Sequence, residues 1–109
     1  MEVWKPVVGY EGLYEVSSKG RVRSVDRVLM DRIGRERLFR GQSIATHLNK
    51  YGYPICKLWM GSTGKTSTIH RLVALSFLEN DDNKPQVNHI DGNKENNSID
   101  NLEWVTNRK

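Results

Sequence analysis

Alternation of apolar and polar residues marks the first part of the chain. Residues 13–16 and 21–25 alternate on either side of the turn sequence Ser-Ser-Lys-Gly, and this period of two is typical of β-strands. The alternation puts Val22 on one face of its strand and Arg21 and Arg23 on the other. The pattern therefore predicts a β-hairpin with a basic exposed face.

Two further hairpins are expected along the chain. Residues 28–30 and 37–39 enclose a polar turn with one glycine, which predicts a weaker hairpin with an arginine-rich tip. Residues 53–60 and 65–69 lie on either side of the sequence Gly-Ser-Thr-Gly and predict a third hairpin. The second strand of this third hairpin is expected to run directly into a helix.

The hydrophobic period changes at that helix. Apolar residues spaced i, i+3, i+4 and i+8 form a stripe on one face of it, namely Ile69, Leu72, Val73 and Phe77. We expect this stripe to pack against the sheet. His70, at the start of the helix, leaves two interpretations open, because it can pack or cap locally or it can lie near a functional site.

Two short strands are expected in the last part of the chain, at residues 86–90 and 102–105, with a polar loop between them. The complete order predicts an α+β fold of small N-terminal antiparallel hairpins, one helix and a final two-stranded hairpin. The larger aromatic side chains are expected in the core: Tyr14, Trp59, Phe77 and Trp104.

Length and composition limit the function classes. The chain has 109 residues, 37% hydrophobic and 28% charged, which fits one compact domain or two very small modules and excludes a large multidomain enzyme. No run approaches the roughly 20 apolar residues of a membrane span, so we expect a cytosolic protein that binds no membrane. The single cysteine, Cys56, cannot form an intrachain disulfide and is expected to be a small buried apolar residue.

The net charge of +4 is concentrated in residues 19–40, which hold eight basic and three acidic side chains. Seven of the eight are arginine, whose planar guanidinium suits phosphate oxygens and base edges. A solvated charged face is the alternative interpretation, but the segment favours nucleic acid. The arginines expected to bind double-stranded DNA are Arg21, Arg23, Arg27, Arg32, Arg35 and Arg37.

Two apparent ligand motifs fail on spacing. The sequence Gly-Ser-Thr-Gly-Lys-Thr at residues 61–66 has two residues between its glycines, where a phosphate-binding loop needs four. The polar loop that begins at Asp91 is similar to a calcium loop, but Asn96 stands where a glycine is required and Leu102 where an acid is required. Both segments are therefore interpreted as turns.

A longer motif is specific. The run Val-Asn-His-Ile-Asp-Gly-Asn-Lys-Glu-Asn-Asn at residues 87–97 is preceded by His-Arg-Leu-Val-Ala at 70–74 and followed by Asn-Leu-Glu-Trp-Val-Thr at 101–106. This combination resembles the His-Asn-His (HNH) endonucleases. Upstream, Trp-Lys-Pro at residue 4, Gly-Tyr-Glu-Gly-Leu-Tyr-Glu-Val at residue 9 and Gly-Arg-Val-Arg-Ser at residue 20 resemble a modular DNA-binding segment that is joined to such nucleases in phages and mobile introns.

The resemblance implies two modules, a DNA-binding β module at residues 1–50 and an HNH module of ββα-metal type at residues 51–109. It implies a phage or mobile-element protein that works in the cytosol of a bacterial or phage-infected host cell. Phosphodiester hydrolysis needs a base for water and a cation at the scissile phosphate. By the resemblance, His89 is that base, Asn88 provides a metal-binding carbonyl oxygen, and Asn101 orients the His89 ring, with Asn97 as the alternative.

The expected ion is Mg²⁺ or Mn²⁺, because hard oxygen ligands and water suit both. Asn88 is neutral, so the ion should be held weakly and depend on the DNA phosphate. On an extended strand, Asn88 and His89 point to opposite sides, so both serve one site only if the strand is twisted or bulged.

The last helix of the ββα unit is expected to be truncated, because the sequence reaches only Asn107-Arg-Lys after the final strand. Asn107 is poorly placed as the second metal ligand. Three explanations stay open: a shortened form of a longer chain, a nuclease that keeps only DNA binding, or a site completed by another chain. A missing helix would also uncover the apolar underside of the final hairpin, and self-association into a homo-oligomer is expected to cover it.

Two functions from different classes therefore remain. The first is a metal-dependent DNA endonuclease that leaves a 5′ phosphate and a 3′ hydroxyl. The second is a non-catalytic DNA-binding protein with a vestigial site, which binds in a salt-sensitive way and cleaves nothing.

Overall fold

The structure is a computed structural model that describes residues 1–106. Its first sheet has the strand order β1-β2-β3, with β1 at Trp4–Pro6, β2 at Tyr14–Ser17 and β3 at Val22–Ser24. Strands β2 and β3 form the first predicted hairpin, and Val16 pairs with Val22 on its buried face. β1 was not predicted, since a three-residue strand that ends in proline carries no alternating pattern of its own.

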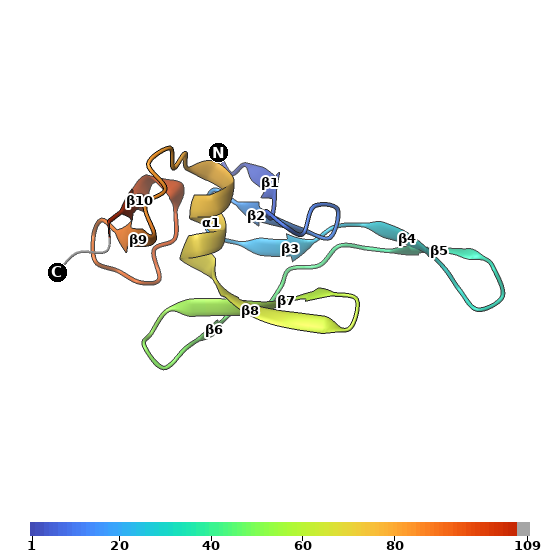
Figure 1. Cartoon of the computed structure of the whole chain (residues 1–109). Coiled ribbons are helices and arrows are strands. Elements are labelled where there is room, and N and C mark those ends of the chain that lie inside the picture. Colours follow the sequence, from blue (N-terminus) through green and yellow to red (C-terminus); the bar gives the residue numbers. More distant parts are fainter. Residues whose placement is uncertain (107–109) are drawn as a thin grey trace.

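The second predicted hairpin is confirmed as β4 (Arg27–Met30) and β5 (Glu36–Phe39), paired antiparallel. Every residue of both strands is exposed. This hairpin projects from the rest of the molecule (Figure 1). The longest dimension of the chain is 58 Å against 29 and 26 Å, and its radius of gyration is 15.6 Å, where about 13 Å is usual for this length.

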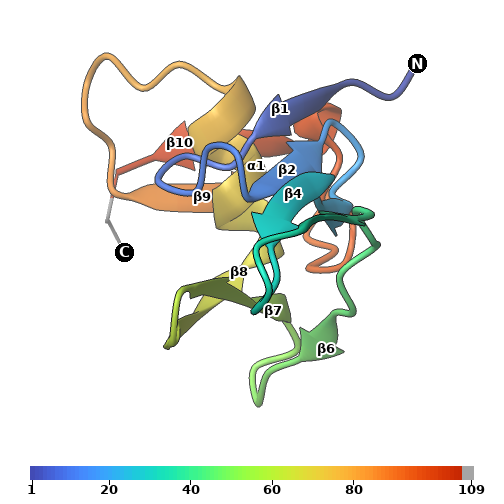
Figure 2. The ribbon, with the colours of Figure 1, turned by 90° about the vertical axis from the view of Figure 1, so that its right-hand side faces the viewer.

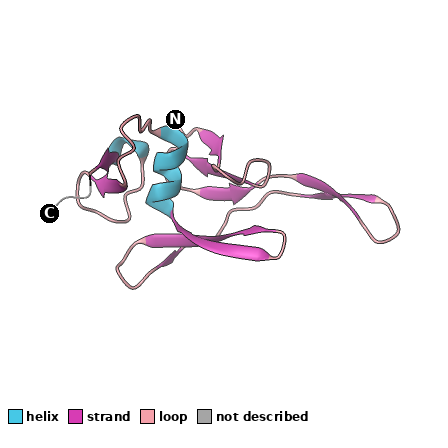
Figure 3. Ribbon diagram, viewed as in Figure 1, coloured by secondary structure: helices cyan, strands magenta, loops and turns pink. Residues whose placement is uncertain are grey.

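The third sheet has the order β6-β7-β8, with β6 at His47–Leu48, β7 at Pro54–Met60 and β8 at Thr63–Thr68. Strands β7 and β8 form the third predicted hairpin, and its turn is the two residues Gly61 and Ser62, because Met60 pairs with Thr63. Strand β6 was not predicted. Figure 3 shows β8 running without a break into the helix, as expected.

Helix α1 spans Ile69–Phe77 and buries Ile69, Leu72 and Val73 of its predicted stripe, whereas Phe77 is only partly buried against the core. After it, β9 (Gln86–His89) pairs antiparallel with β10 (Leu102–Val105), and the short 3-10 helix η1 (Ile99–Asn101) precedes β10. Helix α1 lies at the centre of the molecule, between the first sheet, the third sheet and the β9–β10 hairpin (Figures 1 and 2).

One hydrophobic core contains residues from both expected modules. Val7, Val16 and Val22 of the N-terminal part pack with residues on the other side of position 50, among them Cys56, Leu58, Ile69, Leu72, Val73 and Leu102. Cys56 is buried as predicted, and its burial raises the pKa of the thiol to about 11. The division into modules at residue 50 stays a prediction.

Two packing expectations need correction. Trp59 is exposed, since it alternates with the buried Leu58 on β7 and its ring lies under the ammonium group of Lys57 at 4.8 Å. The apolar face of the final hairpin is covered: Leu102 and Trp104 are buried, α1 packs against β10, and the Trp104 indole donates to the Leu78 carbonyl at 3.2 Å. The argument for self-association from this face therefore fails, and self-association stays an untested prediction.

Candidate active site

His89 is the last residue of β9, and its side chain points inward beside Leu102 of β10. It is only 7% exposed, yet its neighbours are polar and aromatic. Asn88, one residue earlier, alternates to the opposite, exposed face, where its amide donates to the carboxylate of Glu103 at 2.8 Å. The regular register of β9 and β10 contains no bulge at this point. The side chains of Asn88 and His89 therefore lie on different faces of the hairpin.

The ring of His89 is held by Asn97. Nε2 of His89 lies 2.7 Å from Oδ1 of Asn97, and both residues are buried. In the structure this contact is made by Asn97, the alternative, and not by Asn101, the first expectation; which of the two orients the ring during catalysis stays a prediction.

Asn101 is directed into the loop instead of toward the ring. Its amide nitrogen donates to the Asp91 carboxylate and the Asn96 carbonyl, both at 2.9 Å, and its amide oxygen accepts from the Asp91 backbone at 3.0 Å. Asn101 has this orientation because it is the last residue of the short helix η1, which directs its side chain toward the loop immediately before β10 begins. Asn101 therefore braces the loop of residues 91–101 that carries Asn97.

The same network fixes Asp91. Hydrogen bonds from Asn96, from the Asn93 backbone and from Asn101 hold the pKa of the Asp91 carboxyl below its usual value. The bonds from Asn93 and Asn96 close short turns within the loop, and the bond from Asn101 joins the two ends of the loop. Asp91 is thus a charged loop residue with a structural role, in line with its interpretation as a turn residue.

Two aromatic rings complete the surroundings of His89. The His70 ring, from α1, lies 4.9 Å from the His89 ring between centroids, and Tyr53, just before β7, lies 5.1 Å from His70 and 5.9 Å from His89. Of the two interpretations of His70, the structure supports the position near the site. Tyr53 carried no signal in the sequence, because its partners lie 17 and 36 residues further along the chain.

His70 is unusual in its polar contacts. Among residues 1–106, its Nδ1 is the buried side-chain nitrogen or oxygen that lacks a hydrogen-bond partner. Burial, followed by the charges of His89 and Arg71, lowers the pKa of His70 to about 4. The His70 ring is therefore neutral at physiological pH.

The expected DNA-binding arginines fall into two groups. Arg21 forms a two-pronged ion pair with Glu2, and Arg23 donates to Glu15 at 2.7 Å while stacking on the Trp4 ring at 3.9 Å. These arginines line an open cleft of about 780 Å³ together with both carboxylates, so its wall is of mixed charge. Sequence reasoning missed these pairs because Glu2 lies 19 residues from Arg21.

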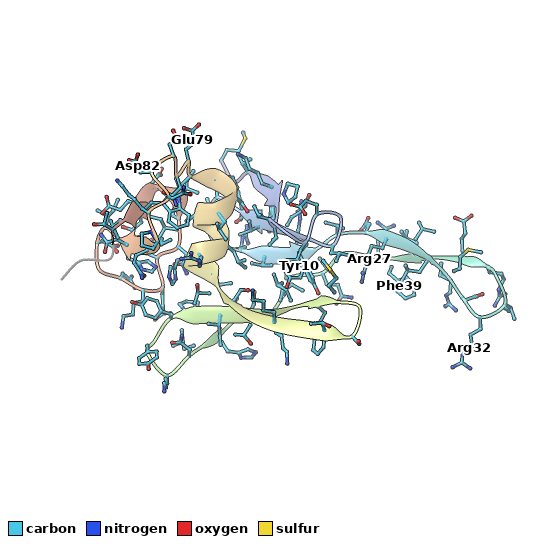
Figure 4. The ribbon with its side chains drawn as sticks, viewed as in Figure 1. Tyr10, Arg27, Arg32, Phe39, Glu79 and Asp82 are labelled. Carbon is cyan, nitrogen blue, oxygen red and sulfur yellow. The ribbon has the colours of Figure 1, made fainter. Side chains whose placement is uncertain are left out.

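The second group lies on the projecting hairpin. Figure 4 shows Arg32 pointing outward at its tip, with Arg27 and Phe39 near its base. Within the part of the chain that the structure describes, Arg27, Arg32 and Arg37 form no ion pair, whereas Arg35 lies 3.3 Å from Asp31. The hairpin therefore presents guanidinium groups to the solvent.

The donor set suits a loosely held hard cation. No group of three or more His, Cys, Asp or Glu side chains able to hold a metal ion occurs among the described residues. On the outer face of the hairpin, Asn88 and Glu103 lie in contact and each has a side-chain oxygen, and so few protein oxygens would suit Mg²⁺-like ions, which keep several waters and use substrate phosphates as ligands. Asn107, the doubtful second ligand, lies outside the described residues.

No helix among the described residues is long and apolar enough to cross a membrane.

The fold and the site define a class of protein. A two-stranded antiparallel hairpin carries an inward histidine whose ring is hydrogen-bonded to an asparagine of the connecting loop, and a basic β-sheet region precedes it; this arrangement agrees with the HNH class of nuclease that the sequence motif resembles. The family model described as NUMOD4 motif matches residues 2–59, and the one described as HNH endonuclease matches residues 68–109. The chain belongs to the HNH endonuclease family, with a NUMOD4 segment at its N-terminal side.

Individual relatives agree with this assignment. DNA endonuclease I-HmuI of Bacillus phage SP01 is 40% identical over 103 residues, which cover 94% of this chain and 52% of the relative. An uncharacterized HNH endonuclease of Acanthamoeba polyphaga mimivirus is 43% identical over 74 residues, 61% of this chain and 22% of the relative.

A solved structure of DNA binding and cleavage by the HNH homing endonuclease I-HmuI superposes with a TM-score of 0.76 and 39% identity, over 95% of this chain and 52% of that chain. The chain thus spans about half the length of the phage relative and of this solved structure. HNH nucleases in general depend on a divalent metal.

Proposed function

We propose that this chain is the catalytic part of a metal-dependent DNA endonuclease that hydrolyses phosphodiester bonds in double-stranded DNA. The observation that carries the proposal is the 2.7 Å contact between Nε2 of His89 and Oδ1 of Asn97, at the end of the β9–β10 hairpin. The similarity to I-HmuI, named as a DNA endonuclease, supports it.

The contact supports one of the two nitrogens of His89 as the base. An amide oxygen only accepts hydrogen bonds, so Nε2 donates its proton to Asn97 and the lone pair resides on Nδ1. Nδ1 of His89 then accepts a proton from the attacking water, while Asn97 keeps the ring in one orientation. The products are a 5′ phosphate and a 3′ hydroxyl.

A divalent cation, Mg²⁺ or Mn²⁺, when bound, neutralises the scissile phosphate and the departing 3′ oxygen. The carbonyl oxygen of Asn88 is the proposed protein ligand. Because the Asn88 side chain shares its face with Glu103 and not with His89, its backbone carbonyl or a rearranged side chain would have to serve the same phosphate. Weak binding of the ion without DNA is the consequence.

The proposed DNA-binding element is the projecting β4–β5 hairpin. Arg27, Arg32 and Arg37 are exposed and unpaired among the described residues, and Arg35 is held only by an exposed ion pair within the turn, so their guanidinium groups are available to phosphate oxygens. Arg21 and Arg23 are already paired with carboxylates. They would bind DNA only in exchange for these partners and should contribute less.

The test is nicking of supercoiled plasmid with Mg²⁺ or Mn²⁺. His89→Ala should lower the cleavage rate by about 10²- to 10⁴-fold, the usual contribution of a general base, with DNA affinity unchanged. His47→Ala on β6 is the matched control, because His47 is exposed and lies on another sheet. Equal nicking by wild type and His89→Ala would end the assignment of His89.

The second candidate function is DNA binding without cleavage in a shared family fold. It is favoured by one observation, the position of the Asn88 side chain beside Glu103, on the face of the β9–β10 hairpin opposite His89. It predicts salt-sensitive binding and no nicking with any divalent ion. The same plasmid assay, run beside a binding titration, separates the two candidates.

A further inference from the structure

The orphaned nitrogen of His70 needs an explanation. A buried polar atom without a partner typically costs about 1–3 kcal/mol, and such atoms in folded proteins are few. Within residues 1–106, Nδ1 of His70 is the buried side-chain nitrogen or oxygen atom for which the structure gives no hydrogen-bond partner. An apolar side chain of similar shape would avoid the cost, so the ring is expected to serve through its other nitrogen.

The burial of Nδ1 also indicates the tautomer. A buried N–H group without an acceptor is rarer in folded proteins than an acceptor that lacks a donor. The neutral ring should therefore have its lone pair on Nδ1 and its proton on Nε2. Unlike Nδ1, Nε2 is not a buried atom without a hydrogen-bond partner. The second position of α1 favours the neutral ring as well, because the positive end of the helix disfavours a cation there.

The location of the His70 ring indicates which group its Nε2–H would contact. His70 and His89 are in edge contact at 4.9 Å, so an oxygen that approaches the water activated by His89 also approaches His70. Tyr53 packs on both rings and limits their motion. A neutral donor suits this place, since a second positive charge would oppose the protonation of His89 during the reaction.

We propose that His70 is a second catalytic histidine, whose Nε2–H donates a hydrogen bond to a non-bridging oxygen of the scissile phosphodiester while Nδ1 of His89 takes the proton of the attacking water. This assignment rests on the proposed nuclease function. A fixed neutral donor aimed at an oxygen that gains charge in the transition state stabilises that state more than the bound substrate.

Two substitutions separate this role from mere packing. His70→Phe keeps a ring against His89 and Tyr53 but has no donor, whereas His70→Gln places an amide N–H near the position of Nε2. Removal of one such donor typically costs about 10²-fold in kcat, so His70→Phe should lose about that factor with KM unchanged, and His70→Gln should recover about tenfold of it.

Cleavage by His70→Phe at the wild-type rate would overturn the proposal. Equal loss in both variants, together with a lower melting temperature in both, would overturn it as well, because that pattern belongs to a structural ring. The nuclease function is judged separately in the same assay, by wild type against His89→Ala.

A measurement independent of cleavage uses NMR of the full chain labelled with ¹⁵N-histidine, with His70→Phe to assign the His70 signals. We expect the Nε2–H tautomer near neutral pH and a shift of the Nε2 resonance when an excess of duplex DNA is added. The Nδ1–H tautomer, or a His70 resonance that saturating DNA leaves in place, would refute the assignment even if the enzyme cuts DNA.

Discussion

Two asparagines of the 91–101 loop have different physical tasks. Asn97 bonds to the ring of His89, and Asn101 makes three hydrogen bonds that shape the loop. Loss of either leaves polar groups unpaired, but only the loss of Asn97 frees the His89 ring. Their substitution therefore separates positioning of the base from stability of the loop.

Asn97→Ala should reduce plasmid nicking by about 10²-fold with DNA affinity retained, because the base is no longer held in one tautomer and orientation. Asn101→Ala should lower the free energy of unfolding by about 1–3 kcal/mol, with the folded fraction still active, since it leaves Asp91 without two of its partners. Cleavage rates and denaturant titrations of both variants provide the check. The reverse assignment of effects would restore Asn101 as the orienting residue.

The Glu2–Arg21 ion pair predicts a pH effect on stability. The hydrogen bonds from Arg21, and then from Ser17, lower the pKa of Glu2 from 4.5 to about 2. A carboxyl whose folded-state pKa is depressed stabilises the fold above its unfolded value and loses this contribution as the pH falls through the folded value. The contribution is therefore present at pH 7 and is lost between about pH 4.5 and 2.

Glu2→Gln should accordingly have a lower melting temperature than wild type at pH 7, and the two temperatures should converge as the pH falls through this window. Because the Arg21 side chain is exposed, added salt should also reduce the difference at pH 7. Thermal melts of both proteins across the pH range measure this difference in melting temperature. A difference that stays constant down to about pH 2 would contradict the ion-pair assignment.

At the scale of elements, the β4–β5 hairpin has two different faces. The register pairs Val28 with Leu38 on one face and Leu29 with Arg37 on the other, so one face is mostly apolar and the other is mixed with arginine. Both faces are exposed and supply nothing to the core. A two-stranded ribbon without a core is marginal by itself, and its exposed cations indicate binding rather than stability.

The double variant Arg32→Ala/Arg37→Ala should weaken DNA binding and flatten the plot of log affinity against log salt, by about 0.9 for each phosphate that the protein no longer neutralises. Its melting temperature should stay near that of wild type, since neither residue is buried. Arg21→Ala is the comparison variant, because its guanidinium is already paired with Glu2, and its effect on the slope should be smaller. An equal salt slope for wild type, the double variant and Arg21→Ala would show that the β4–β5 hairpin does not provide the DNA-binding contacts.

Local pattern was enough for the hairpins, for α1 and for the β9–β10 strands, because alternation, turn residues and a helical stripe act over fewer than about ten residues. It failed for β6, whose two residues form a strand only because Ile55 and Pro54 lie beside them. It failed also where the partner lies far along the chain, as for Arg21 with Glu2 and for His70 with His89. His89 itself was predicted through its motif, whereas the choice between Asn97 and Asn101 depended on the turn made by η1.

At the scale of the whole molecule, the N-terminal sheet supports the candidate site directly. The Ile99 backbone donates to the Ser18 carbonyl at 2.9 Å, which ties the 91–101 loop to the β2–β3 turn. Gly20, in that same turn, lies so close to Asn97 that a Cβ atom there would be 2.7 Å from the Cβ of Asn97. The segment expected to bind DNA therefore packs directly against the loop that holds the base.

This packing can be tested with a pair of glycine substitutions. Gly20 and Gly12 both have positive φ, +86° and +83°, so alanine at either should cost about 1–2 kcal/mol of backbone strain. Only at Gly20 does the added methyl group meet Asn97, whereas nothing lies within 4 Å of it at Gly12. Gly20→Ala should therefore lower nicking by roughly tenfold more than Gly12→Ala at a temperature where both are folded, because Asn97 is displaced and the His89 ring loses its partner. Plasmid cleavage rates compared with circular dichroism melts measure this, and equal cleavage by the two variants would show that the first sheet does not position the base.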